Sequence, residues 1–379
     1  MKKIISKVNS FLSKVAEKKL KIKNDRDQLP AERFIIKEPF SFKINLTSYH
    51  INSDPYWKEQ KVYQSHEIYY TEVKNASIIG KGVVVNREGE VLLESTIFQK
   101  EYLDKLNVNH LISCQKLLPT RKLEKVFSVA NRLDKSYYHW TLEILPRILV
   151  ANQTPSFNNY KILIAHHSPS YTKESIAFLF PSLAANIEEV KVFQRVITNT
   201  TRLIPFLHIR DTSTRMMNIY YPEMIVKLNK LAHQQIENIE NIQKKYPTHL
   251  IISRKNALQR RILNEEETVK YLGKYGFVNI CLEELPFKEQ LLHFYYAKKV
   301  IAVHGAGITN IIYGKNLKLL ELFPEERTIR DAHYFAQISA ALNFDHFLIK
   351  YKSSNINQDL RIDQKLLAKI GKTLSLEML

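Results

Sequence analysis

The sequence is poor in cysteine and glycine. Its 379 residues include two cysteines, Cys114 and Cys281, and nine glycines. Two distant cysteines exclude a disulfide scaffold and the cysteine-rich zinc patterns, and they favour a reducing compartment. A run of about 18 uninterrupted apolar residues is absent as well, so we expect no transmembrane helix. The length predicts about two domains, each large enough to fold on a hydrophobic core.

Acidic residues are also scarce relative to basic ones. The chain has 56 Lys and Arg against 38 Asp and Glu, which gives a formal net charge of +18. Such an excess favours anionic partners, namely nucleic acid, anionic lipid or phosphorylated small molecules. An AT-rich genome would account for part of the same excess. Charge alone therefore does not choose among these partners.

Part of the excess lies in residues 1–30, which carry nine Lys or Arg and three Asp or Glu. Within them, residues 3–20 place Ile4, Val8, Leu12 and Val15 near helical spacing, with lysines between. This pattern predicts a basic amphipathic helix. Such a helix can lie on an anionic membrane surface or pack against its own domain, and both interpretations remain open.

The rest of the chain alternates between apolar runs of strand length and helical patterns, most regularly from residue 249 onward. This alternation predicts an α/β protein with largely parallel sheets of Rossmann-like type. A polar stretch at residues 211–215 marks a candidate interdomain link. The predicted organisation is an N-terminal extension at 1–30, two Rossmann-like domains at 31–212 and 213–352, and a helical tail at 353–379.

Ligands bind outside the carboxyl ends of strands in such sheets, and a small-residue turn lies at one of these ends. His304-Gly305-Ala306-Gly307 follows the predicted strand 299–303, and Ile308-Thr309-Asn310 continues into a predicted helix. Glycine lets the backbone approach an anion, and the first N–H groups of a helix then face it. Thr309 and Asn310 could add side-chain donors. The alternative is a tight turn of purely structural use.

Arginines follow an earlier strand, predicted at 249–253. Arg254 comes directly after Ser253, and Arg260 lies in the same loop. A guanidinium placed there can bind a diphosphate through two N–H groups, although a solvated basic loop would look the same. Glu321 is predicted to end the strand that begins at 317, where a carboxylate could accept hydrogen bonds from ribose hydroxyls.

The N-terminal half has one comparable cluster, on a predicted helix from Tyr137 to Asn152 that Pro146 should kink or restart. His139 and Glu143 are four residues apart and so share a face of this helix. They could form part of a zinc site, although no third ligand is evident nearby. They could also form an acid–base pair that deprotonates an alcohol, or simply pack on an aromatic face.

Taken together, these motifs resemble glycosyltransferase family 61 over roughly residues 125–350. The resemblance rests on Tyr138-His139-Trp140, Glu143, Leu145-Pro146-Arg147, Ile252-Ser253-Arg254, Arg260 to Glu265, Ala302 to Asn310 and Leu320 to Pro324. It implies a GT-B fold, in which two Rossmann-like domains face a cleft. It also implies an inverting transferase with a nucleotide-sugar donor, often a UDP-sugar, with no catalytic metal and no cofactor.

The resemblance also assigns roles to the residues in these motifs. It implies that the C-terminal domain binds the donor through Ser253, Arg254, Arg260, His304, Gly305, Ala306, Gly307, Thr309, Asn310 and Glu321. The catalytic base is expected among Glu143, His139 and His304, with Glu143 favoured because a carboxylate is ionised at neutral pH.

The acceptor is expected to be a glycan or a lipid-linked molecule of bacterial capsule or lipopolysaccharide synthesis. We expect a cytoplasmic enzyme, peripheral on the inner face of the membrane and in contact with anionic lipid. One alternative is a family member that has lost activity and serves as a binding module. Another is a basic nucleic-acid-binding protein, for which no recognised sequence motif is present.

Overall fold

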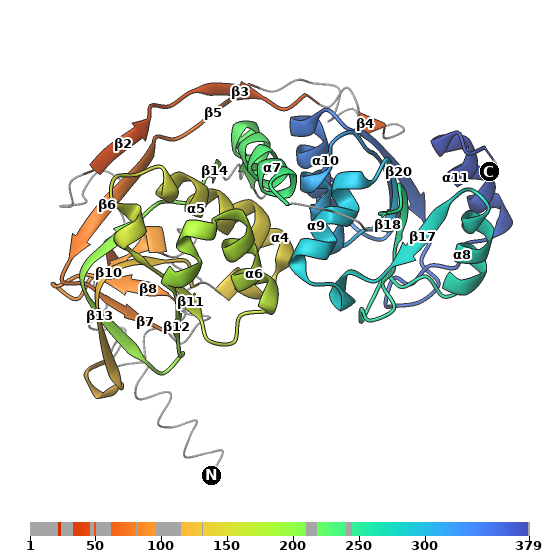
Figure 1. Cartoon of the computed structure of the whole chain (residues 1–379). Helices are drawn as coiled ribbons and strands as arrows, with labels where there is room; N and C mark the ends of the chain where they lie inside the picture. Colours follow the sequence, from red (N-terminus) through yellow and green to blue (C-terminus); the bar gives the residue numbers. More distant parts are fainter. Residues whose placement is uncertain are drawn as a thin grey trace, which may run out of the picture. The chain divides into compact units, whose positions relative to one another are not determined.

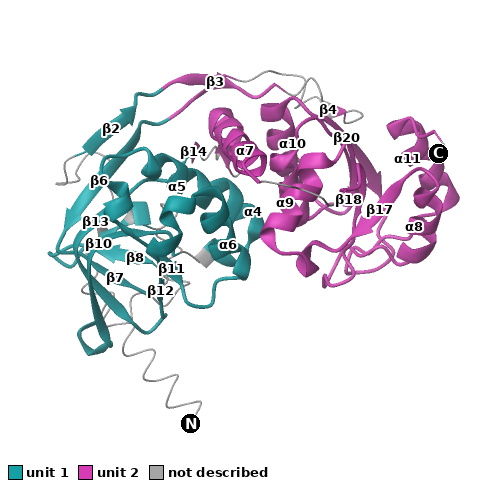
Figure 2. Ribbon diagram, viewed as in Figure 1, with its two compact units in different colours: residues 1–39, 66–207 teal, residues 40–65, 208–379 magenta. Residues whose placement is uncertain are grey.

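The computed structural model of the chain is shown in Figure 1. It describes residues 22–23, 33–45, 49–50, 62–80, 82–95, 115–130, 132–209, 218–239 and 245–377. The helix predicted at 3–20, the link predicted at 211–215 and Cys114 lie outside these residues. The chain divides into two compact units, residues 1–39 with 66–207 and residues 40–65 with 208–379, called unit 1 and unit 2 below (Figure 2).

Unit 1 is built on a sheet with a parallel centre. Its parallel strands are β10 (Thr120–Ser128), β11 (Lys161–Ala165), β12 (Ile187–Val190) and β13 (Arg195–Leu203), in the spatial order β13-β10-β11-β12. On its other side, β13 pairs antiparallel with β7 (Ser77–Ile79) and β6 (Ile68–Lys74). The sheet continues through β8 (Val83–Val85), β9 (Val91–Leu92) and β1 (Ile22–Lys23), and β2 (Arg33–Lys37) pairs with β6.

The helices of unit 1 follow the parallel strands in sequence. A helical run comprises α4 (Tyr137–His139), a π-helical turn η5 (Trp140–Ile144) and α5 (Leu145–Asn152). Helix α6 (Ser170–Leu179) and the 3₁₀ helix η7 (Pro181–Asn186) come between β11 and β12, and short 3₁₀ turns lie at 93–95, 115–117, 132–135 and 157–159. Pro146 is the second residue of α5, directly after the π-turn, so the predicted restart of the helix at this proline is confirmed.

Unit 2 contains a sheet in which every strand pair is parallel. The strands are β16 (His249–Ile252), β17 (Phe277–Ile280), β18 (Lys299–Val303), β19 (Lys318–Pro324) and β20 (Asp345–Tyr351), in the order β17-β16-β18-β19-β20, with β4 (Tyr49–His50) beside β20. Two small antiparallel pairs accompany it, β3 (Ser41–Lys43) with β5 (Val62–Gln64) and β14 (His208–Ile209) with β15 (Ile219–Tyr220).

Helices cover both faces of the unit 2 sheet. On one face, α8 (Glu265–Gly273) and α11 (Gln364–Leu374) bury Leu272, Leu367 and Ile370 in a core shared with the central strands. Figure 1 shows α7 (Pro222–Glu237), α9 (Phe287–Tyr296) and α10 (Ile329–Leu342) on the opposite face. Two 3₁₀ helices, η8 (Leu282–Glu284) and η9 (Ala306–Tyr313), complete the unit. The predicted α/β class with parallel sheets is therefore confirmed.

The two units divide the chain differently from the predicted domains, and one difference concerns residues 40–65. Residues 40–65, which the sequence analysis placed in an N-terminal domain spanning 31–212, belong to unit 2. The reason is strand pairing and packing: Tyr49 and His50 add β4 to the edge of the unit 2 sheet, and Ile44 packs against Ile219. Among the described residues, we find no helix with the length and apolar character needed to cross a bilayer.

Candidate functional site

Each unit has a point where the order of its parallel strands reverses. In unit 1 the chain moves outward from β10 to β11 and β12, then returns to place β13 on the other side of β10. In unit 2 the reversal falls between β16 and β18. The crevice outside the carboxyl ends of the strands at such a point is the usual ligand site of open α/β sheets.

In unit 2, Arg254 and Gly305 follow the two strands at the reversal. The Nε–H of Arg254 donates to the backbone oxygen of Arg260 at 3.1 Å, and Nη2 donates to that of Gln259 at 3.1 Å. A Cβ atom built at Gly305 would lie 1.8 Å from Nη1 of Arg254. Arg254 therefore holds its own loop and fits against Gly305 only because that residue lacks a side chain.

A cluster of three arginines forms at this edge of the unit 2 sheet, from Arg254, Arg260 and Arg327. Burial, together with the positive charges of Arg254 and Arg327, lowers the pKa of Arg260 to about 10. Arg327 pairs with Asp331 at 2.8 Å, but its Nε and that of Arg260 are buried without a hydrogen-bond partner in the described parts of the chain. These N–H groups lack acceptors, and the three guanidinium groups repel one another. A bound anion would supply acceptors and reduce the repulsion.

Sequence reasoning identified Arg254 and Arg260 but missed Arg327. The strand before it was predicted to end at Glu321, whereas β19 continues to Pro324. Arg327 therefore follows the carboxyl end of a parallel strand by three residues, which is the signal that could have identified it.

The turn at His304–Asn310 offers backbone groups to the same crevice. The first hydrogen bond of η9 runs from the N–H of Ile308 to the oxygen of Gly305, so the N–H groups of Ala306 and Gly307 precede its ladder. Ala306 is exposed. Thus the backbone of this turn has the donors that the sequence predicted for an anion site.

The polar side chains of Thr309 and Asn310 in that turn, and of Ser253 after β16, are buried. Asn310 is buried and donates to Gln290 and to the backbone oxygen of Gly307. Thr309 has no exposed surface, and its hydroxyl has no partner among the described residues. Ser253 is also buried, and its hydroxyl donates to Glu265 at 2.7 Å. This geometry gives these three side chains structural positions and does not favour direct contact with an anion.

Glu321 lies within β19, so the prediction that it ends its strand is wrong. Its side chain is fully buried. One carboxylate oxygen lies 2.5 Å from Nδ1 of His304 and the other 3.0 Å from Nε2 of His346. Because both oxygens already have partners, the predicted contact with ribose hydroxyls is not favoured by this arrangement.

Glu321 instead joins two histidines in a buried network. Burial and the nearby arginines lower the pKa of His304, and burial lowers that of His346 to about 3. Both imidazoles are therefore neutral near neutral pH. Burial raises the pKa of Glu321, whereas Arg327 and Arg260 oppose that shift. Because Nδ1 of His304 is engaged by Glu321, Nε2 is the ring nitrogen of His304 left for another partner.

In unit 1, His139, Glu143 and Arg147 lie on one face of the helical run at the strand reversal. The Nε–H of Arg147 donates at 2.8 Å to the backbone oxygen of Ile204, the residue directly after β13. His139 Nδ1 lies 2.8 Å from a carboxylate oxygen of Glu143. The shared face that the sequence predicted for His139 and Glu143 is therefore confirmed.

The two members of this pair differ in access to solvent. The side chain of Glu143 is 1% exposed and that of His139 is 29% exposed. Arg147 is fully buried, which lowers its pKa to about 10, although the charge of Glu143 opposes the shift. A carboxylate that holds Nδ1 of an imidazole leaves Nε2 free to take a proton. His139 is thus the more accessible side chain of this pair.

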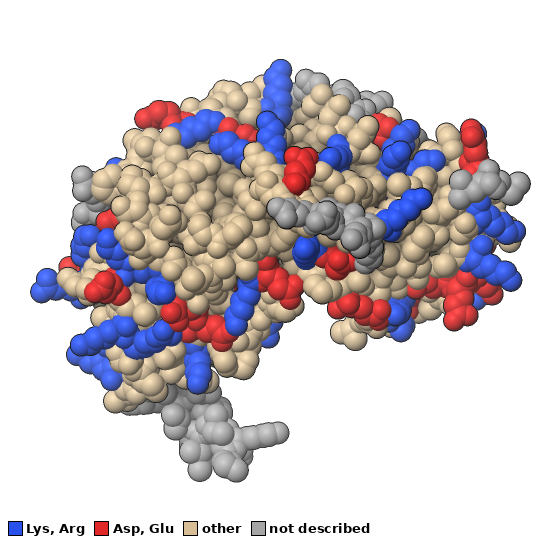
Figure 3. All heavy atoms as spheres, in the orientation of Figure 1, with Lys and Arg blue, Asp and Glu red and all other residues tan. Residues whose placement is uncertain are grey.

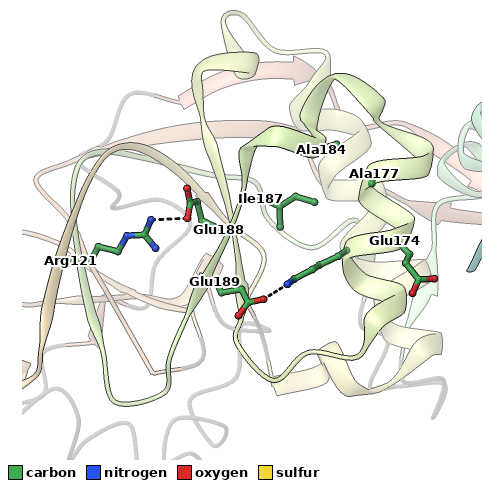
Figure 4. Close-up of a pocket in the computed structure, with 8 residues that line it drawn as sticks. Arg121, Glu174, Ala177, Ala184, Ile187, Glu188 and Glu189 are labelled. Atoms are coloured by element: carbon green, nitrogen blue, oxygen red, sulfur yellow. Dashed lines mark hydrogen bonds and ion pairs between the residues drawn. The ribbon is translucent and has the colours of Figure 1, made fainter. Parts of the chain in front are cut away.

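A separate cavity in unit 1 contains none of these residues. It has a volume of about 630 Å³ and is lined by Arg121, Lys173, Glu174, Ala177, Ala184, Ile187, Glu188 and Glu189. Arg121 pairs with Glu188 at 2.7 Å, and Lys173 pairs with Glu189 (Figure 4). Within the described ranges, no group of three or more His, Cys, Asp or Glu side chains is arranged to hold a metal ion.

The chain was compared with models of known protein families. Residues 137–319 match the family model described as Glycosyltransferase 61. The chain carries a glycosyltransferase family 61 domain. The match begins at the helix that holds His139 and ends within β19. It contains both strands of the unit 2 reversal, β16 and β18, but begins after β10 of the unit 1 reversal. The resemblance seen in the sequence is confirmed, and the family implies a sugar donor and an acceptor as substrates. None of the curated proteins matches the chain.

Proposed function

We propose that this protein is an inverting glycosyltransferase that uses a nucleoside diphosphate sugar, with UDP-sugars as the first candidates. The observation that supports this proposal most is the cluster of Arg254, Arg260 and Arg327 at the strand reversal of unit 2. The negative charge of a diphosphate would neutralise the positive charge of these arginines. Guanidinium groups also bind phosphate oxygens through paired N–H groups. The acceptor would be a glycan or lipid-linked molecule of bacterial surface polysaccharide synthesis.

In the proposed reaction, the acceptor hydroxyl attacks the anomeric carbon from the face opposite the diphosphate. The new carbon–oxygen bond forms as the bond to the diphosphate breaks, and the bonding electrons leave with the diphosphate. The three arginines and the N–H groups of Ala306 and Gly307 would stabilise this developing negative charge. These cationic and backbone donors can supply the role that a metal ion has in other transferases, so we propose catalysis without a metal or cofactor.

We propose that the acceptor proton goes to Nε2 of His139. Glu143, favoured as the base from sequence alone, would instead hold Nδ1 of the imidazole and stabilise the imidazolium that forms. The support for this reversal is the difference in exposure between the two side chains. His304 is an alternative base, because its Nδ1 is similarly held by Glu321. However, the arginines near His304 lower its pKa and so disfavour the imidazolium that a base must form.

We also propose a location for this enzyme: it is cytoplasmic and acts on the inner face of the membrane. The basic character of the chain supports this part of the proposal. Its net charge of +18 suits both an anionic donor and an anionic lipid surface.

The proposed function is tested by incubating the protein with a panel of nucleotide sugars and following release of the nucleoside diphosphate. We expect slow hydrolysis of one donor class without acceptor, and weaker binding of that donor by Arg254→Ala. The matched control is Arg361→Ala, an exposed arginine outside the cluster. Hydrolysis of no donor, together with no nucleotide binding, would support the alternative of an inactive family member. Equal donor affinity in wild type and Arg254→Ala would overturn the assignment of the donor site.

A further inference from the structure

An exposed apolar and basic surface lies at the opposite end of the unit 1 sheet from its candidate catalytic residues. Strands β10 and β13 are parallel and begin side by side, with Thr120 opposite Arg195. The Arg195 N–H donates to the Pro119 oxygen at 3.0 Å and closes this end of the pair. The reacting groups proposed above lie past the carboxyl ends, so this end has no part in that chemistry.

Two large apolar side chains protrude from this end. Leu117 is 84% exposed and Phe193 is 71% exposed. Each lies two residues before one partner of the Arg195–Pro119 hydrogen bond, which brings the two segments together. Phe193 lies in a tight turn closed by the Gln194 N–H, which donates to the Lys191 oxygen. Exposed apolar side chains on neighbouring segments, with polar residues around them, form the kind of surface that binds a protein partner or a membrane.

Lysines lie on the same two segments as these apolar side chains. Lys116, Lys122 and Lys191 are exposed, and their ammonium groups have no partner among the described residues. Segments 115–125 and 191–195 together carry six Lys or Arg and one Glu. Figure 3 shows Lys and Arg side chains gathered over this part of unit 1, in the region of β10 and β13 in Figure 1.

The carboxylates of Glu188 and Glu189 do not neutralise these lysines. Glu188 accepts from Arg121 at 2.7 Å and lies 3.8 Å from Lys161. Glu189 pairs with Lys173 and His166. The two glutamates therefore have cations of their own, and the positive field of the three lysines persists.

We propose that Lys116, Leu117, Lys122, Lys191 and Phe193, called the amino-end patch, bind the surface of an anionic membrane. Leu117 and Phe193 would enter the boundary between headgroups and acyl chains, and the lysines would contact anionic headgroups. A nucleic acid would satisfy the lysines but would leave Leu117 in water. The inference is independent of the proposed sugar transfer, because binding to lipid needs neither donor nor acceptor.

The test is sedimentation of the full chain with phosphatidylcholine vesicles that contain or lack phosphatidylglycerol. We expect binding to the anionic vesicles that weakens at least about tenfold in Leu117→Ser/Phe193→Ser and in Lys116→Gln/Lys122→Gln/Lys191→Gln. The matched controls lie in unit 2: Ile356→Ser, which alters a side chain that is 97% exposed, and Lys270→Gln/Lys274→Gln/Lys369→Gln. These controls should bind like wild type.

Two outcomes would overturn the inference. One is anionic-vesicle binding that is equal in wild type and both patch variants, since other basic segments would then account for all of it. The other is unchanged vesicle binding with weakened binding to single-stranded RNA. Donor hydrolysis measured on the same proteins separates the two proposals, because the patch variants should hydrolyse the donor like wild type.

Discussion

The guanidinium of Arg254 occupies the space that a side chain at Gly305 would need. A Cβ atom at position 305 would lie 1.8 Å from Nη1 of Arg254. The two residues follow β16 and β18, the neighbouring strands between which the order of the unit 2 sheet reverses. The glycine and the arginine thus form one structural pair across the candidate donor site.

Gly305→Ala should displace Arg254 while leaving the fold intact, because the atom in its way is the end of a flexible side chain. We expect donor affinity to fall at least about tenfold, as for loss of a charge-assisted hydrogen bond. The control is Gly273→Ala at the end of α8, where a Cβ atom meets nothing within 4 Å. Titration calorimetry with the nucleoside diphosphate would measure both, and equal affinities would argue against the pairing.

Substitution of Arg260 or Arg327 should separate stability from binding. Arg260→Gln removes a charge that its neighbours repel, so thermal stability without ligand should be unchanged or higher. Nucleotide affinity should fall by about 1.5–3 kcal/mol, because a charged donor to the diphosphate is lost. Arg327→Gln should give the same loss of affinity. If both variants instead lost stability and kept full affinity, the cluster would be structural.

The proposed base can be tested by comparing His139→Ala with Glu143→Gln. His139→Ala should lower kcat by about 10²–10⁴, the usual contribution of a general base, with donor affinity unchanged. Glu143→Gln should lower kcat less, because it weakens the orientation of the imidazole but keeps the imidazole itself. The reverse ranking would return the role of base to Glu143. Equal activity in wild type and both variants would contradict both assignments and leave His304 as the candidate base.

Activity should persist in EDTA, because the arginines and backbone N–H groups would carry the charge of the leaving diphosphate. The measurement is donor turnover before and after dialysis against the chelator. Loss of turnover that Mn²⁺ or Mg²⁺ restores would contradict this proposal and would call for a metal bound by the diphosphate itself.

Stability should fall at mildly acidic pH through buried histidines. Burial lowers the pKa of His333 in α10 to about 3, from an ordinary value of 6.5. Between these values the unfolded chain binds the proton and the folded chain does not, so stability is lost as pH falls below about 6.5. From pH 7 to pH 5 this residue should contribute a loss of about 2 kcal/mol.

The variant His333→Phe isolates this contribution, because a phenyl ring of similar size does not titrate. Chemical denaturation of both proteins at the two pH values should show a smaller acid-induced loss of stability in the variant. The difference should be about 2 kcal/mol. Identical losses would show that His333 does not drive the effect and would assign it to other groups, such as His346.

The α/β class, the parallel strands and the positions of Arg254, His304 and the His139–Glu143 pair could be predicted from the sequence alone. This was possible because these features are local. Strands such as 161–165 and 299–303 are continuous apolar runs bounded by polar residues, and helical spacing alone puts residues four apart on one face.

Which of these residues are accessible and which are buried could not be predicted in this way, because it depends on the folded chain. Burial of Glu143 beneath His139, and of Glu321 between His304 and His346, depends on packing among segments far apart in the chain. The same holds for Arg327, whose place beside Arg260 requires β16 and β19 to lie in one sheet. Residues 40–65 joined unit 2 for the same reason, because the pairing of β4 with β20 joins positions about 300 residues apart and leaves no local pattern.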